Sequence, residues 1–256
     1  MKYFLKALRI AAVAFFWLAV WIVAAYLVDM PLLFPYPWEV LKRLFELMGT
    51  LTFYTVTLRS LCNVLIGTLI AIVGGCALSC LTARFSFCRQ LFLAPMTIIK
   101  ATPVASVIIL LWLFIGSAFL PSFITVLIVL PVVWTNLDEG WRRIDKGLAE
   151  MTRVYGFSPS RRMLYLTLPS LKPYFVSACR TSIGLAWKAG IAAEIIVRPI
   201  SSIGLHISDA KYSLESIDLF TWTLVVIFLS LAIELAFSFL FDKLGGAKPQ
   251  KEERSI

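Results

Sequence analysis

The sequence contains few of the residues on which most enzymes and metal proteins depend. Its 256 residues include one histidine, His206, and its five cysteines show no zinc-motif spacing. A single histidine without neighbouring ligands is typical of a polar loop residue, and the cysteines are expected to be small apolar fillers. No segment reads GxxxxGKS or GxxxxGKT, the loop that cradles nucleotide phosphates. We therefore expect no metal, no cofactor and no ATP site in this chain.

Charged residues are also scarce, at 15% of the chain, whereas hydrophobic residues make up 60%. Soluble domains contain about 45–50% apolar residues, so the excess requires an apolar environment. Uncharged runs cover 10–28, 61–83 and 101–137, and runs with a few charges cover 174–197 and 219–241. Because a span needs roughly 20 residues, the run 101–137 is long enough for two. The pattern predicts an all-α, polytopic membrane protein with about six transmembrane helices.

The first run could be a cleaved signal peptide or a retained span. Its basic start fits both, but the run is longer than the apolar region of a typical signal peptide. No convincing cleavage site precedes Asp29. We therefore expect residues 1–28 to form an N-terminal transmembrane helix.

The net charge is +9, from 24 Lys and Arg residues against 15 Asp and Glu residues. In a soluble protein this excess would suggest a nucleic-acid partner. Here the basic residues cluster between alternate hydrophobic runs, which the positive-inside rule explains better. We expect a multi-pass protein of the cell inner (cytoplasmic) membrane, with both termini in the cytoplasm. Its surroundings would be the lipid bilayer, and no nucleic acid is expected as a partner.

The segments between the runs define the expected organisation. Residues 29–54 form an external connector interrupted by three prolines, and an amphipathic pattern over 38–49 predicts a surface helix within it. Residues 55–241 form the transmembrane core, which includes a long cytoplasmic loop over 138–172. Residues 242–256 form a basic cytoplasmic tail.

Small residues recur every four positions in the run 61–83, at Gly67, Ala71, Gly75 and Ser79. Such a stripe lets helix backbones approach closely within a bilayer. It could form a contact between two subunits or a packing face within one chain. We expect the second.

The loop 138–172 is predicted to begin with a short helix. Asp145 is placed to cap it, and Gly156 stands where a helix-terminating glycine belongs. Between them an apolar stripe follows at helical spacing, formed by Leu148, Met151, Val154 and Tyr155.

A second helix is predicted to begin at Ser158 and Pro159, which supply a cap and a preformed first turn. It is expected to end at Thr167, before Leu168 and Pro169. The resulting hairpin is too apolar on one side to stand free in water. It needs a protein partner or the membrane surface, and the pattern alone does not choose between them.

The residues of this loop resemble a known motif. EMT at 150–152, then Gly156, then LTLP at 166–169 resemble the EAA loop of ABC importer permeases, which reads EAA, three residues, G, nine residues, IxLP. All three spacings match. Methionine and threonine replace the two alanines, and leucine replaces the isoleucine.

Further segments resemble the nitrate, sulfonate and taurine type of these permeases. LFPYPWEV at 33–40 is similar to its LxPxPxxV stretch, and AWK at 186–188 with AAE at 192–194 is similar to its AW and AAE motif. SIGL at 202–205 stands near its GLG, with the first glycine missing. The resemblance covers roughly residues 32–243.

The resemblance implies a type I ABC importer permease fold without enzymatic activity of its own. Its partners would be ATP-binding cassette ATPase subunits, a second permease copy or paralogue, and a substrate-binding protein. Residues 147–157 would dock into an ATPase subunit, and closure of two ATPases would tilt the spans. Glu150 and Arg153 would supply polar contacts, unless they are solvated charges of an amphipathic helix. The expected coupling-loop residues are Leu148, Glu150, Met151, Arg153, Val154, Tyr155, Gly156 and Pro169.

The fifth predicted span is the best candidate for the wall of a translocation pathway. Arg180 and Arg198 are 18 residues apart, or five helical turns, and Glu194 lies about 40° away. Charged side chains face lipid only at a high cost, so this face should meet a pathway or a partner helix. Alternatively, Arg198 and Glu194 form a structural pair. Lys100 stands beside Pro103, which should break its helix. The candidate pathway residues are Lys100, Arg180, Trp187, Lys188 and Glu194.

Two other classes of protein fit parts of the sequence. A self-powered secondary transporter or channel would often show internal repeats, and none is convincing here. An intramembrane enzyme would need catalytic residues within the spans, and the spans contain neither histidine nor aspartate. The expected function is import of a small solute delivered by an extracytoplasmic binding protein. The resemblance implies nitrate, sulfonates, taurine, bicarbonate or a vitamin precursor as cargo, and the sequence does not choose among them. It also leaves open a homodimer or a heterodimer of permeases.

Overall fold

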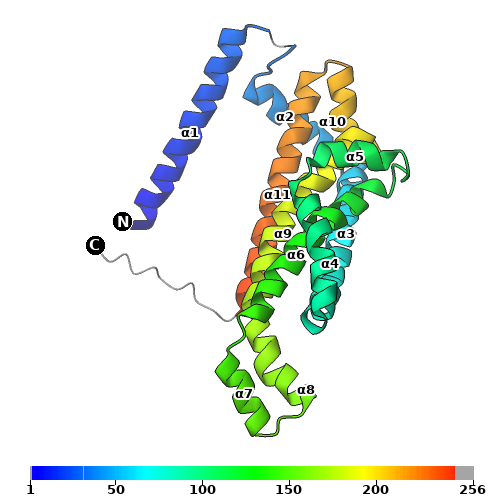
Figure 1. The fold of residues 1–256 in the computed structure, drawn as a ribbon. Helices are drawn as coiled ribbons and strands as arrows, with labels where there is room; N and C mark the ends of the chain where they lie inside the picture. The colour runs from blue at the N-terminus through cyan, green and yellow to red at the C-terminus, as the bar shows by residue number, and fades with distance from the viewer. Residues whose placement is uncertain (1, 31, 246–256) are drawn as a thin grey trace. The chain divides into compact units, whose positions relative to one another are not determined.

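The computed structural model describes residues 2–30 and 32–245, and within these residues it contains helices but no strand (Figure 1). The predicted all-α fold is thereby confirmed. The chain divides into two compact units, a first unit (Met1–Ser60 and Glu194–Phe228) and a second unit (Leu61–Ala193 and Leu229–Ile256). Pro31 of the predicted connector and residues 246–256 of the predicted tail lie outside the described residues.

The first unit is built from three helices and parts of three longer ones. It contains α1 (Lys2–Val28), α2 (Pro37–Met48) and α10 (Ile203–Tyr212), the N-terminal parts of α3 (Leu51–Arg84) and α11 (Ser216–Gly245), and the last turn of α9 (Leu168–Val197). Pro37 occupies the first position of α2, where its fixed φ suits the helix. Glu39 accepts a hydrogen bond from the backbone N–H of Tyr36 at 2.9 Å. A helix therefore lies where the surface helix is predicted, and its position in the membrane stays a prediction.

Two long-range contacts join α2 and α10 to α11 within the first unit. Arg43 on α2 donates hydrogen bonds of 2.6 and 3.0 Å to Asp218 at the start of α11, and this bonding raises the pKa of Arg43 above its ordinary value. His206 on α10 stacks on Trp222, with 4.8 Å between ring centroids, and burial lowers the pKa of His206. The expectation of a loop histidine is wrong, because His206 belongs to helix packing.

The second unit contains the remaining helices. These are the rest of α3, α9 and α11, together with α4 (Ser86–Ala101), α5 (Val104–Trp112), α6 (Leu120–Arg142), α7 (Lys146–Val154), α8 (Pro159–Arg162) and the π-helical η1 (Met163–Thr167). α4 and α5 both pack against α6. Figure 1 shows α7 and α8 as two short helices joined by a turn.

The small-residue stripe of α3 packs against α6 within the chain. A Cβ atom added at Gly67 would lie 2.5 Å from the carbonyl oxygen of Ser122, and one added at Gly75 would lie 2.7 Å from Val133. Real Cβ atoms do not come so close to other heavy atoms, so a side chain at either position would force the two helices to shift. The expected packing face within one chain is confirmed.

Four described helices are long and apolar enough to cross a membrane: Ala11–Val28, Leu51–Arg84, Leu120–Arg142 and Ser216–Phe241. α4 and α5 pass the same test together, although they are bent by 103°. The helix α9, which contains the predicted fifth span, is not among them. Its charged residues Arg180, Lys188 and Glu194 lower its apolar character. The count of six spans is therefore not confirmed by length and composition.

The bend between α4 and α5 falls where the sequence predicts a break. α4 ends at Ala101, next to Lys100, and the extended residues Thr102 and Pro103 precede α5. Proline cannot donate a backbone hydrogen bond and disfavours the helical conformation of the residue before it. The predicted interruption of the apolar run is confirmed.

Candidate functional site

The hairpin of α7 and α8 grows from a charged anchor at the end of α6. Asp138 is buried, and it accepts hydrogen bonds from Arg89 on α4 at 2.8 and 3.1 Å. Arg142 approaches the same carboxylate at 3.2 Å. The indole N–H of Trp141 donates to the hydroxyl of Ser79 on α3 at 3.0 Å. The end of α6 is thus fixed to two neighbouring helices before the chain leaves it.

The first loop helix forms as its capping residues predict. The side chain of Asp145 accepts the backbone N–H of Leu148 at 2.9 Å, which satisfies a donor that the first turn leaves unpaired. After α7 ends at Val154, Gly156 adopts a φ of +62°. A Cβ atom at Gly156 would meet nothing within 4 Å. The backbone conformation, and not crowding, is what requires glycine at this turn.

The second loop helix begins as predicted but does not end as predicted. Ser158 accepts the N–H of Arg161, and Pro159 stands at the first position of α8. The chain then continues through η1 into α9, so Pro169 is not a stop. The N–H of Leu168 bonds to the carbonyl of Met163, five residues back. This π turn shifts the hydrogen-bond register, and Pro169 falls in the first turn of α9, where a missing N–H is tolerated.

The apolar stripe of α7 faces away from the rest of the chain. Val154 is 84% exposed, and Leu148, Met151 and Tyr155 are each at least half exposed. Glu150 is exposed as well. Arg153 lies elsewhere, because it lines a cavity together with Lys146 and Ala149. The loop therefore carries an apolar face that the described residues leave uncovered.

The candidate pathway residues differ in their exposure and in their contacts. Lys100 and Lys188 are exposed, and the ammonium of Lys100 donates to the hydroxyl of Thr135 at 3.2 Å. Arg180 lines a small cavity of about 170 Å³ with Glu234 of α11. Trp187 is buried, with 1% of its surface exposed. Only Lys100, Arg180 and Lys188 therefore present surface to a solute in this conformation.

Glu194 is enclosed in the first unit, with no exposed surface. Its Oε2 atom accepts hydrogen bonds from the Ser60 hydroxyl at 2.7 Å and from the Gly204 N–H at 3.2 Å. The Ser60 oxygen in turn accepts the N–H of Ile203 at 2.9 Å. Oε1 of Glu194 has no hydrogen-bond partner among the described residues. We call this group the Glu194 clasp.

The alternative pair of Arg198 with Glu194 is wrong. α9 ends at Val197, and Arg198 adopts a left-handed φ of 54°, which turns its side chain out of the helical register. Its guanidinium pairs with Asp209 of α10 and lies 5.0 Å from the ring centroid of Tyr212. The angle around a helix axis can be counted only for residues within the helix. Arg198 lies beyond the end of α9, so the helical spacing in the sequence does not predict its direction.

Sequence reasoning missed two neighbours of the candidate residues. Ser60 lies inside a long helix, and no motif in the neighbouring sequence indicates that it is a hydrogen-bond partner of Glu194. Glu234 is the one acidic residue in the middle of α11, and a carboxylate inside an apolar run is a signal that could have drawn attention to it. A Cβ atom added at Gly184 of α9 would lie 2.9 Å from the Glu234 carboxylate.

The sequence of this chain is similar to those of known transport proteins. Residues 64–245 match the family model described as "Binding-protein-dependent transport system inner membrane component". The bicarbonate transport system permease protein CmpB of Synechococcus elongatus is 38% identical over 86 residues, which are 32% of this chain and 31% of that protein. The match therefore spans about a third of that relative's length. A probable ABC transporter permease protein of Haemophilus influenzae is 27% identical over 93% of this chain and 96% of its own.

The fold is also similar to a solved structure. The crystal structure of an amino acid ABC transporter with histidines matches with a TM-score of 0.60, over 75% of this chain and 92% of the matched chain. The two sequences are 16% identical, so this likeness concerns the fold alone.

Proposed function

Because this chain belongs to the family of binding-protein-dependent transport system inner membrane components, we propose that it is the permease subunit of an ATP-driven importer of a small solute. ATP hydrolysis belongs to separate ATP-binding cassette subunits. A substrate-binding protein delivers the cargo, and a second permease copy or paralogue completes the membrane part. The described residues form a helical scaffold, and no step of the proposed transport needs a covalent reaction in this chain.

The uncovered stripe of α7 is the observation that carries this proposal. Leu148, Met151, Val154 and Tyr155 project from a helix that is held at its start by the cap at Asp145 and released at its end by Gly156. Exposed apolar side chains on a fixed helix favour insertion into a groove of a partner protein. A displacement of α7 by the ATPase subunits would be transmitted to α6 and α9, because these two long helices precede and follow the loop in the chain.

The docking of α7 is tested by adding a charge to the stripe. Val154→Asp is expected to lower recovery of the ATPase subunits in a pulldown by about tenfold, since a charge placed within an apolar interface is costly. Ser160→Asp is the matched control, because it adds the same charge to an exposed position on α8 of the same loop. Equal recovery with both variants would contradict the docking role.

The proposed cargo is a small anion. The Synechococcus relative is named for bicarbonate, and the exposed cations Lys100 and Lys188 provide a favourable field for a negative group. ATPase activity of the reconstituted complex is measured with the binding protein loaded in turn with bicarbonate, nitrate, an alkyl sulfonate and a neutral sugar. Stimulation by the sugar alone would overturn the anion assignment.

We propose that the chain lies in the inner membrane of the cell. Both termini and the α7–α8 hairpin would then face the cytoplasm. In a background without native cysteines, an impermeant thiol reagent is expected to label a cysteine placed at Ser213 from outside. A cysteine placed at Ser160 should react only after permeabilisation. Labelling of position 160 in intact cells would reverse the orientation and exclude docking to a cytoplasmic ATPase.

A further inference from the structure

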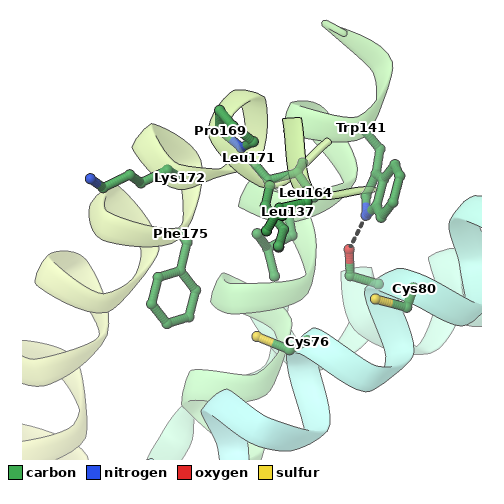
Figure 2. A pocket seen from close by; sticks show the side chains of 11 residues that line it. Cys76, Cys80, Leu137, Trp141, Leu164, Pro169, Leu171, Lys172 and Phe175 are labelled. Atoms are coloured by element: carbon green, nitrogen blue, oxygen red, sulfur yellow. Dashed lines mark hydrogen bonds between the residues drawn. The ribbon is translucent and has the colours of Figure 1, made fainter. Parts of the chain in front are cut away.

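Two cavities of the second unit adjoin at the base of the hairpin and share Trp141 as a wall. The first has a volume of about 560 Å³ and an almost entirely apolar lining (Figure 2). Cys76 and Cys80 contribute from α3, Leu137 from α6 and Phe175 from α9. Lys172 is the only charged lining residue in the described part of the chain, and Figure 2 shows it extending away from the other labelled side chains. This apolar cavity has the character of a site for hydrocarbon.

The second cavity has the opposite character. It has a volume of about 700 Å³, and the charged residues that line it within residues 2–30 and 32–245 are all basic: Arg84, Arg142, Lys146, Arg153 and Arg162. They come from four helices, α3, α6, α7 and α8, so the cluster depends on the tertiary fold. Arg142 is paired with Asp138. Within the described residues the other four form no ion pair.

The basic cavity is distinct from the surface proposed to dock an ATPase. Lys146, Ala149 and Arg153 recur at spacings of three and four and so share one face of α7. Three of the four residues of the exposed stripe, Leu148, Met151 and Tyr155, lie on the opposite face of the helix, and Val154 lies between the two faces. α7 therefore presents an apolar face outward and a basic face to the cavity.

From these two cavities we infer that the base of the hairpin binds an anionic phospholipid. The phosphate occupies the basic cavity, and part of an acyl chain occupies the apolar cavity on the other side of Trp141. Four uncompensated cations around one cavity repel each other, and a phosphate relieves this repulsion while accepting several charge-assisted hydrogen bonds. Basic pockets at the ends of transmembrane helices bind anionic headgroups on this principle. A free anion would leave the adjoining apolar cavity without an occupant.

This site requires a bilayer, but it requires neither a particular cargo nor the docking of α7. A lipid that joins α3, α6, α7 and α8 would fix the hairpin relative to the helices from which it projects. The position of the hairpin would then depend on the lipid composition of the membrane. The proposed import cycle does not by itself require such a dependence.

The full-length protein, purified in a neutral detergent with the subunits that copurify, is examined by native mass spectrometry and thermal unfolding. The probes are phosphatidylglycerol, phosphatidylcholine with the same chains, and glycerol phosphate. Phosphatidylglycerol is expected to remain bound and to raise the unfolding temperature. Equal retention of phosphatidylcholine would overturn the proposal. An equal effect of glycerol phosphate would make the cavity a free-anion site and would also overturn it.

Matched variants locate the binding. Arg162→Gln is expected to weaken phosphatidylglycerol binding about fivefold, the effect typical of one basic residue near a charged headgroup. Arg161→Gln removes the same charge from the neighbouring residue, which does not line the cavity, and should leave binding unchanged. Cys80→Trp places a bulky group in the apolar cavity and should lower retention of the lipid without affecting assembly of the complex. Equal weakening by Arg161→Gln and Arg162→Gln, or undiminished retention in Cys80→Trp, would contradict the assignment.

Discussion

The hydroxyl of Ser60 donates a hydrogen bond of 2.7 Å to the carboxylate of Glu194, 134 positions further along the chain. The same hydroxyl accepts the N–H of Ile203, and the carboxylate also accepts the N–H of Gly204. One buried polar point thus joins α3, the last turn of α9 and the first turn of α10 within the first unit. Buried carboxylates are costly unless they are hydrogen-bonded, so the partners of Glu194 are part of its stability.

The clasp depends on the absence of a side chain at position 204. A Cβ atom at Gly204 would lie 2.3 Å from the backbone carbonyl carbon of Glu194, which neither segment can avoid by rotating a side chain. Gly204→Ala is expected to destabilise the protein by about 3 kcal/mol, the upper end of the cost of overpacking. Thermal unfolding in detergent measures the effect. Gly116→Ala is the control, since a Cβ atom there meets nothing within 4 Å, and equal losses would refute the clash.

The charge of Glu194 is expected to matter less than its hydrogen bonds. Glu194→Gln keeps an oxygen that accepts from Ser60 and Gly204, and it removes the charge of a buried carboxylate whose Oε1 atom has no partner among the described residues. Stability and transport should both stay close to the native values. Ser60→Ala should instead cost about 1–3 kcal/mol, because it leaves the N–H of Ile203 unpaired in a buried site. Loss of transport in a fully stable Glu194→Gln protein would show that the carboxylate contacts the cargo.

The sequence predicted those parts of the site that depend on neighbouring residues. The caps at Asp145 and Ser158 and the left-handed turn at Gly156 are local devices, and all three are present. The prediction that Pro169 ends the second loop helix is wrong, because the effect of this proline depends on the π turn before it. No short sequence motif predicts such a turn. The pairing of Ser60 with Glu194 joins residues far apart in the chain, and helical periodicity carries no information about such a contact.

Gly156 is expected to be required for assembly and not for insertion. Its φ of +62° costs a β-branched residue about 1–2 kcal/mol, so Gly156→Val should distort the turn and lower recovery of ATPase subunits. Gly156→Asn is the matched control, because asparagine tolerates the left-handed conformation, and it should restore most of the recovery. The amount of protein in the membrane is measured in parallel. Native recovery with valine at position 156 would remove the turn from the coupling role.

Lys188 is the sharpest test of the proposed pathway. It is exposed on α9, and within the described residues it makes no ion pair or hydrogen bond. Glu194, on the same helix, does not serve as its counter-charge, because that carboxylate is fully buried whereas Lys188 is exposed. A lysine at membrane depth is costly without water or an anion beside it. We therefore expect its partner to be the cargo or a facing subunit.

Lys188→Ala is expected to lower the ATPase stimulation produced by the loaded binding protein about tenfold, as for the loss of one charged hydrogen bond. The yield of the purified complex should not change. Lys188→Arg keeps the charge and should preserve most of the stimulation. The two quantities are measured side by side, because a lysine that only anchors the helix would affect them in the opposite way. Normal stimulation with a reduced yield would assign Lys188 to assembly and remove it from the pathway.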